Sequence, residues 1–222
     1  MFDALKRAIR QRRLADPHYA FLFEPPPADE AVSIDCETTG LNPRTDDIVS
    51  VAAVKIRGSR ILTSEIFEAK LKPETALKPD AIKVHTLREQ DVASGRPMAE
   101  VLPDLLRFIG SRPLVGFYLE FDVAMLNKHV RRMIGIALPN PQLEVSGVYY
   151  DLKYRGAPPG AQVDLRFTSL MKDLALPFLD QHDAAADALM TAMIHVILMD
   201  RRARGLKIPR ERAKAVLQYG GG

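Results

Sequence analysis

The sequence predicts an α/β protein built on one mixed β-sheet that is flanked by helices. Three β-branched, apolar stretches follow one another between residues 31 and 73, and the turns between them are too short for anything but antiparallel pairs. Beyond residue 79, helix-length segments alternate with short apolar strands, as in βα units. The predicted sheet is therefore an antiparallel three-stranded meander followed by parallel strands.

The composition excludes several classes of protein. With 222 residues, of which 47% are hydrophobic and 27% charged, the chain is long enough for one well-filled core. Cys36 is the only cysteine, which excludes an internal disulfide framework and favours a reducing compartment. No apolar run approaches the ~20 residues that cross a bilayer. We therefore expect a cytoplasmic protein without a membrane partner.

Changes in composition divide the chain into three parts. Residues 1–30 hold a basic, amphipathic helix and the proline-stiffened linker "EPPPADE". An organellar transit peptide is the alternative for this basic segment. Residues 31–205 form the main domain, and residues 206–222 a basic tail. The formal net charge of +3 permits a polyanionic partner but indicates it only weakly. The oligomeric state is not predicted.

Each element of the main domain has its own pattern. "AVSID", "DIVSVAAVKIRG" and "RILTSEIFEAKLKP" have the composition of strands, and "PLVGFY" is a further short strand. "GVYYDLKYR" fits either a strand or the start of a helix. The remaining segments have helical length and spacing, and Gly205 ends the last of them; they are "DAIKVHTLREQDVASG", "PMAEVLPDLLRFIGSR", "EFDVAMLNKHVRRMIG", "TSLMKDLAL" and "HDAAADALMTAMIHVILMDRRARG".

Two acids stand in the first predicted strand, in "VSIDCETTGL". Residues two apart in a strand point to the same face, so Asp35 and Glu37 project together and Cys36 projects the other way. Two carboxylates about 5 Å apart repel by roughly 3 kcal/mol at an effective dielectric constant of 20. A hard divalent cation would offset this repulsion. An isolated D-x-E more often reaches solvent or pairs with a basic side chain.

Further acids occur where two other elements begin. Asp122 follows the strand "PLVGFY" at the start of a helix, a position where an acid also complements the helix dipole. Asp187 lies on a largely apolar side of the last helix, where a carboxylate needs a partner. His182 lies near the entry to that helix, five residues before Asp187. Alone, such a histidine is usually a cap or a surface residue.

Three motifs, taken together, resemble those of a known family. "DCETTGL", "GFYLEFD" and "HDAAAD", in this order, are similar to the three motifs of the DEDDh group of DnaQ-like 3′→5′ exonucleases, the family of the proofreading epsilon subunit of bacterial DNA polymerase III. The resemblance extends from Val32 to Met199. It implies a ribonuclease H-like fold, which agrees with the predicted mixed sheet.

The resemblance also implies the residues of the site. Two divalent cations, Mg²⁺ or Mn²⁺, would be held by four acids, Asp35, Glu37, Asp122 and Asp187, all of which are expected to be catalytic. His182 would act as the general base. The expected contacts with the terminal nucleotide of the substrate are made by Thr38, Thr39, Leu41 and Phe121.

The implied function is metal-dependent 3′→5′ hydrolysis of phosphodiester bonds. Nucleoside 5′-monophosphates would be released from single-stranded or frayed DNA, in proofreading or repair, and the partners would be DNA 3′ ends and a polymerase or repair complex. RNA or an oligoribonucleotide is the first alternative substrate, and a non-catalytic nucleic-acid- or partner-binding module is the second alternative. Many relatives carry His-Asn where this chain has Phe117 and Tyr118, which affects the prediction of substrate preference.

Overall fold

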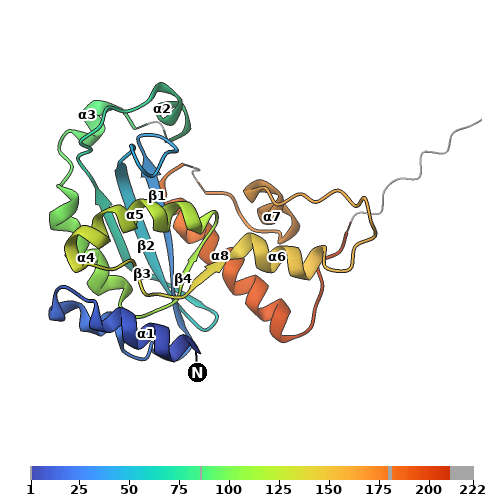
Figure 1. Cartoon of the computed structure of the whole chain (residues 1–222). Helices are drawn as coiled ribbons and strands as arrows, with labels where there is room; N and C mark the ends of the chain where they lie inside the picture. Colours follow the sequence, from blue (N-terminus) through green and yellow to red (C-terminus); the bar gives the residue numbers. More distant parts are fainter. Residues whose placement is uncertain (1, 86, 180–181, 211–222) are drawn as a thin grey trace, which may run out of the picture.

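One twisted five-stranded sheet organises the computed structural model, which describes residues 2–85, 87–179 and 182–210. The order of the strands across the sheet is β3-β2-β1-β4-β5, and most of this sheet is visible in Figure 1. The strands are β1 (Glu30–Thr38), β2 (Ile48–Arg57), β3 (Arg60–Lys70), β4 (Leu114–Gly116) and β5 (Gln142–Glu144). The predicted mixed topology is confirmed, because β1, β2 and β3 pair antiparallel while β4 and β5 join in parallel.

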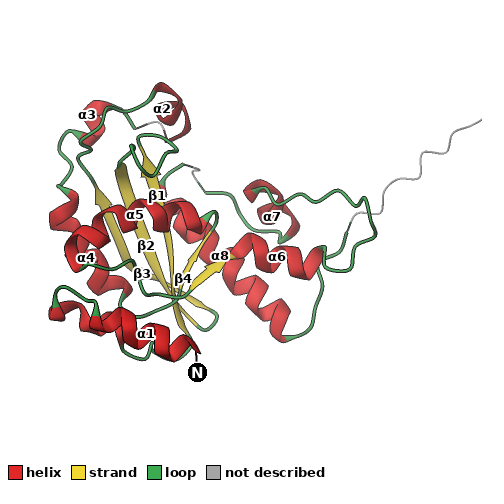
Figure 2. Cartoon of the chain, viewed as in Figure 1, coloured by secondary structure: helices red, strands yellow, loops and turns green. Residues whose placement is uncertain are grey.

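Helices cover both faces of the sheet (Figure 2). Helices α4 (Met98–Ile109) and α5 (Leu119–Ile134) pack on one face, and α8 (Ala184–Ala203) packs across the other, with α6 (Val145–Lys153) beside it. Three shorter helices lie at the periphery, namely α2 (Pro79–His85), α3 (Glu89–Val92) and α7 (Phe167–Asp173). None of the described helices is long and apolar enough to cross a membrane.

Alternation along β1 separates two hydrophobic cores. Val32, Ile34 and Cys36 belong to the core beneath α4 and α5. Residues at the intervening positions face α8, because successive side chains of a strand point to opposite faces. Asp35 and Glu37 therefore point toward the α8 side, as the sequence predicts.

The segment before β1 packs against the same body. Helix α1 (Phe2–Arg12) is joined to it through Arg10, whose guanidinium donates to the carbonyl oxygens of Ala137 and Leu138 at 3.0 and 2.8 Å. The 3₁₀ helix η1 (Pro17–Phe23) places Leu22 fully inside the α4–α5 core. Residues 211–222, most of the predicted basic tail, lie outside the described residues.

Several predicted elements differ in detail. The segment 80–95 is not one helix, since α2 and α3 are separate short helices. The ambiguous segment beginning at Gly147 is helical, as part of α6, whose first turn is capped by the Glu144 carboxylate accepting from the Ser146 backbone N–H at 3.0 Å. Strand β5 and helix η1 were not predicted. The other predicted helices of the main domain are present as α4, α5, α7 and α8, and Gly205 follows α8 in a left-handed conformation with φ 65°.

Candidate active site

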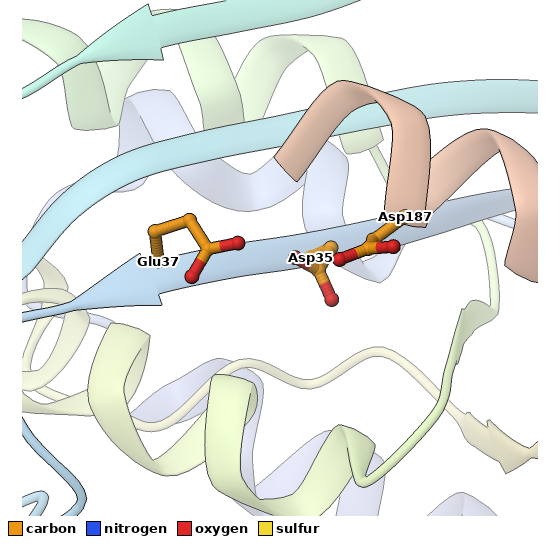
Figure 3. Close-up of side chains that lie close together, drawn as sticks. All are labelled: Asp35, Glu37 and Asp187. Atoms are coloured by element: carbon orange, nitrogen blue, oxygen red, sulfur yellow. The ribbon is translucent and has the colours of Figure 1, made fainter. Parts of the chain in front are cut away.

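Three acids from two elements meet beside the carboxyl end of β1. Asp35 and Glu37 project from the strand, and Asp187 reaches them from the first turn of α8 (Figure 3). One carboxylate oxygen from each of the three lies within 4.8 Å of the others. Among the described residues, this is a group that could hold a metal ion, and its all-oxygen donors suit a hard divalent cation.

The electrostatics of the cluster show that protein atoms alone do not neutralise it. Burial, with the nearby charges of Asp122 and Glu37, raises the pKa of Asp35 well above its usual value. Burial, with the charge of Asp187, raises the pKa of Glu37 to about 7. Burial also raises the pKa of Asp187. In the absence of a cation, these acids therefore hold protons that isolated carboxyl groups would lose.

Asp122 lies next to this cluster but outside its tightest group. It occupies the first turn of α5, is 4% exposed and forms hydrogen bonds to the backbone and thiol of Cys36. Burial raises the pKa of Asp122 even though the Cys36 backbone hydrogen bond favours its charged form. The structure thus brings together all four predicted acids, three in direct proximity and the fourth behind the strand residue between Asp35 and Glu37.

His182 is placed at the open side of the site. Its backbone N–H donates to the Asp187 carboxylate at 3.0 Å, and its side chain is exposed. The backbone of His182 is left-handed, with φ 65°, an uncommon conformation in which histidine is enriched. This turn fixes the approach of the chain to α8. The imidazole ring is exposed to solvent next to the first turn of α8.

The end of β1 and the loop after it contain three of the four residues predicted to contact substrate. Leu41 is 85% exposed and stands out from the loop. Thr38 donates its hydroxyl hydrogen to the Gly40 carbonyl oxygen at 2.8 Å, while the Thr39 hydroxyl lies 3.1 Å from that of Thr75. The side chains of both threonines thus hold the loop in shape. The fourth residue, Phe121, is partly buried against the α4–α5 core.

Two further acids border the site. Glu144, at the end of β5, accepts from the Leu119 backbone N–H at 3.0 Å, and its charge raises the pKa of Asp122. Sequence reasoning missed Glu144, because an acid before a serine at a helix start is an ordinary cap. Asp183 caps α8 by accepting from the Ala186 backbone N–H at 3.0 Å. Its charge also raises the pKa of Asp35 and of Glu37.

Comparison with known proteins agrees with this geometry. A family model described as an exonuclease matches residues 32–195. The chain is 25% identical over 203 residues to the PolC-type DNA polymerase III of Thermotoga maritima, covering 79% of this chain and 15% of the relative. It is 33% identical over 113 residues to the DNA polymerase III epsilon subunit of Aquifex aeolicus, covering 50% of this chain and 54% of that subunit.

Solved structures confirm the fold. Exonuclease X in complex with 5′ overhanging duplex DNA superposes with a TM-score of 0.59 at 23% identity, covering 80% of this chain and 95% of that one. Exonuclease I of E. coli, in complex with an oligonucleotide, gives a TM-score of 0.66 at 17% identity, covering 79% of this chain and 42% of the other. The chain spans only 11 to 15% of the length of four PolC-type DNA polymerase III relatives, which include the one from Thermotoga maritima. The family predicted from the three motifs is confirmed, and the chain belongs to the DnaQ-like exonuclease family.

Proposed function

We propose that the chain is a metal-dependent 3′→5′ exonuclease that removes nucleoside 5′-monophosphates from single-stranded or frayed DNA ends. The observation that carries the proposal is the group of three carboxylates within 4.8 Å of one another, with Asp122 beside it. Such a concentration of like charge is unfavourable for folding and has no structural role that a neutral side chain could not perform. The same group of carboxylates is suited to binding cations, and those cations would in turn bind a phosphodiester.

The four acids would hold two Mg²⁺ or Mn²⁺ ions, which when bound would activate water and stabilise the leaving oxygen. Asp35 would hold the cations together with its acidic neighbours, because its carboxylate lies close to those of Glu37 and Asp187 and the nearby charge of Asp122 raises its pKa. Glu37 and Asp187 would complete one coordination sphere. Asp122, behind Cys36, would support the second sphere, in keeping with its greater burial.

His182 would accept a proton from the attacking water. Imidazole suits this role because histidine is the side chain that most often acts as a general base in enzymes. Water would bond to phosphorus while the bond to the 3′-oxygen of the preceding nucleotide breaks, and that oxygen would take a proton from solvent. The backbone of Thr38 and Thr39 would hold the terminal 3′-hydroxyl, with Leu41 and Phe121 against the last base.

The substrate and the pathway are also part of the proposal. DNA is favoured by the similarity to DNA polymerase III subunits, and a polymerase or repair complex is the corresponding partner. RNA hydrolysis uses the same chemistry and is an outcome that the assay must separate, since a 2′-hydroxyl would have to fit beside the terminal sugar.

The test uses single strands of DNA and RNA of identical sequence, labelled at the 5′ end. With Mn²⁺ we expect stepwise shortening from the 3′ end, faster for DNA, and no shortening with a chelator. Asp35→Asn should slow it by more than about 100-fold, because metal ions supply several kcal/mol of transition-state stabilisation. Asp151→Asn, on the partly exposed surface of α6, is the matched control.

Shortening that persists in chelator, or unaltered rates in Asp35→Asn, would contradict the proposal. Binding without any cleavage would indicate the non-catalytic module.

A further inference from the structure

Tyr118 exposes a large aromatic ring in the turn that leads into the helix carrying Asp122. The residue is 73% exposed and connects β4 to α5, four residues before Asp122. In the parallel pairing of β1 with β4, Val32 lies opposite Leu114 and Ser33 opposite Val115. Continuing this register brings the turn after Gly116 level with Asp35 and Cys36. The backbone of this turn therefore lies next to the part of β1 that carries the acids.

The backbone of Tyr118 is held in an unfavourable conformation. Its φ of 55° and ψ of 33° are left-handed, which is a genuine outlier for a bulky residue. The Leu119 N–H donates to the Glu144 carboxylate at 3.0 Å, and the Phe121 N–H donates to the Tyr118 carbonyl oxygen at 2.9 Å. A Cβ on Gly116 would lie 2.8 Å from the Leu119 side chain, so the turn is tightly packed. Such conformations persist where the surroundings fix them, and they concentrate at functional sites.

Two more aromatic rings hold the Tyr118 ring in place. The Phe117 ring lies 4.9 Å from the Tyr118 ring with an interplanar angle of 82°, and 5.1 Å from the Phe167 ring with an angle of 67°. Edge-to-face contacts of this kind are favourable for aromatic pairs. Phe117 and Phe167 pack against the hydrophobic core on the α8 side of the sheet. These ring contacts connect the exposed Tyr118 ring to the interior of the protein and restrict the motion of that ring.

We propose that Tyr118 is a platform on which an unpaired base near the 3′ end of the substrate stacks. Aromatic side chains bind bases in this way with little regard to sequence. The bases of a duplex are already stacked on their neighbours, so only an unpaired strand can supply a base to the ring. Tyr118 would therefore select single-stranded ends. This inference rests on the proposed function, and it adds a specificity-determining residue that acts on binding and not on the hydrolysis step.

The test measures binding separately from cleavage, in an Asp35→Asn background that removes turnover. Four short DNA strands are compared. In each strand, a different one of the last four nucleotides is replaced by an abasic position. With Tyr118 present, we expect one abasic position to weaken binding by about 5- to 150-fold, the range for one base stacked on an aromatic ring. Tyr118→Asn should reduce that penalty to less than twofold, whereas Tyr118→Phe should keep it. Asparagine tolerates the left-handed backbone, so Tyr118→Asn is expected to fold at least as stably.

A tryptophan provides a second readout, because the chain contains none. The fluorescence of Tyr118→Trp should be quenched by single-stranded DNA and not by a blunt duplex. Tyr150→Trp on α6, where the native residue is 42% exposed, is the control and should respond to neither. Binding with the same abasic profile in Tyr118→Asn, or equal quenching at both tryptophans, overturns the inference alone. Absence of binding to every strand overturns the proposed function as well.

Discussion

The Lys128 ammonium lies 2.7 Å from the Asp47 carboxylate and joins α5 to the loop that follows β1. Lys128 also donates to the Asp46 carbonyl oxygen at 2.8 Å. The other carboxylate oxygen of Asp47 accepts from the backbone N–H groups of Glu74 and Thr75. Burial works against the charge of Asp47, but these partners outweigh it and hold its pKa below the usual value. The loop carrying Thr39 is thereby fixed relative to the helix carrying Asp122.

Removing the lysine should loosen this connection. Lys128→Met leaves a largely buried carboxylate without its cation, so the free energy of unfolding should fall by about 3 kcal/mol. DNA binding should weaken as well, because Thr39 would lose its fixed position. Urea denaturation measures the first effect and titration with single-stranded DNA the second. Lys83→Met is the control, since its pair with Asp80 is exposed and should contribute less than about 1 kcal/mol. Equal effects of the two substitutions would contradict this account.

Divalent cations should stabilise the folded protein. At a concentration 100 times the dissociation constant, Mn²⁺ adds about 2.7 kcal/mol to the free energy of unfolding. For a chain of this length, that corresponds to a rise in Tm of roughly 5–10 °C. Asp35→Ala should abolish the rise in a thermal shift measurement, and Asp151→Ala should retain it. A full rise in Asp35→Ala would place the bound ions elsewhere.

Without metal, stability should decrease as the pH rises. The pKa of Glu37 is raised from 4.5 to about 7, so between these values the folded state binds more protons than the unfolded state. The contribution of Glu37 to the free energy of unfolding is therefore fully present below about pH 4.5 and falls by up to about 3 kcal/mol as the pH rises to 7, with Asp35 and Asp187 acting in the same direction. Urea denaturation in chelator should show this slope, and Glu37→Gln should reduce it. A wild-type protein that matches Glu37→Gln at every pH would refute the assignment.

His182 should affect turnover more than binding. Loss of a general base typically lowers rates by 10²–10⁴-fold. His182→Asn suits this test, because asparagine also tolerates the left-handed backbone at this position. Single-turnover rates should fall within that range while the dissociation constant for DNA changes less than about threefold. His18→Asn, at a side chain that is 93% exposed on η1, should change neither. Parallel losses in rate and affinity would instead indicate that His182 positions the loop.

Gly40 should not tolerate a side chain. A Cβ at this position would lie 2.4 Å from an Asp46 carboxylate oxygen and 2.7 Å from the Lys78 side chain. Gly40→Ala would separate this ion pair, so we expect a loss of about 1–3 kcal/mol in stability and a higher KM. Gly147→Ala, in α6 with no atom within 4 Å of the added Cβ, should instead stabilise the protein by up to about 1 kcal/mol. Urea denaturation of both variants checks the contrast.

The sequence predicted the elements whose patterns are long or repeated. The β-branched runs of β1 and β2 and the apolar stripe of α5 each bury a regular face, and that regularity is visible in the residues themselves. Strand β5 is three residues long and partly exposed, so it carries no such pattern and is defined only by pairing with β4. Helix η1 packs into the core without an α-helical period. Both depend on tertiary contacts that one sequence does not display.

The candidate site was predictable to the extent that chemistry constrains residue type. Asp35 and Glu37 are fixed by strand alternation, and Asp122, His182 and Asp187 by the resemblance of their motifs. The role of Asp47 was not predictable, because an aspartate in a turn is ordinary until Lys128 is seen beside it. The left-handed backbone conformation of Tyr118 was not predictable from the sequence either. A left-handed tyrosine contradicts local preference, and only its neighbours in the fold explain it.

The acid cluster is drawn from segments far apart in the chain, with Asp187 contributed by α8, the last described helix. During synthesis, the ribosome releases β1 long before α8 emerges. A nascent chain therefore carries Asp35 and Glu37 without the carboxylate that completes their group. A cation that needs all three carboxylates therefore has no complete site until α8 has packed on the sheet.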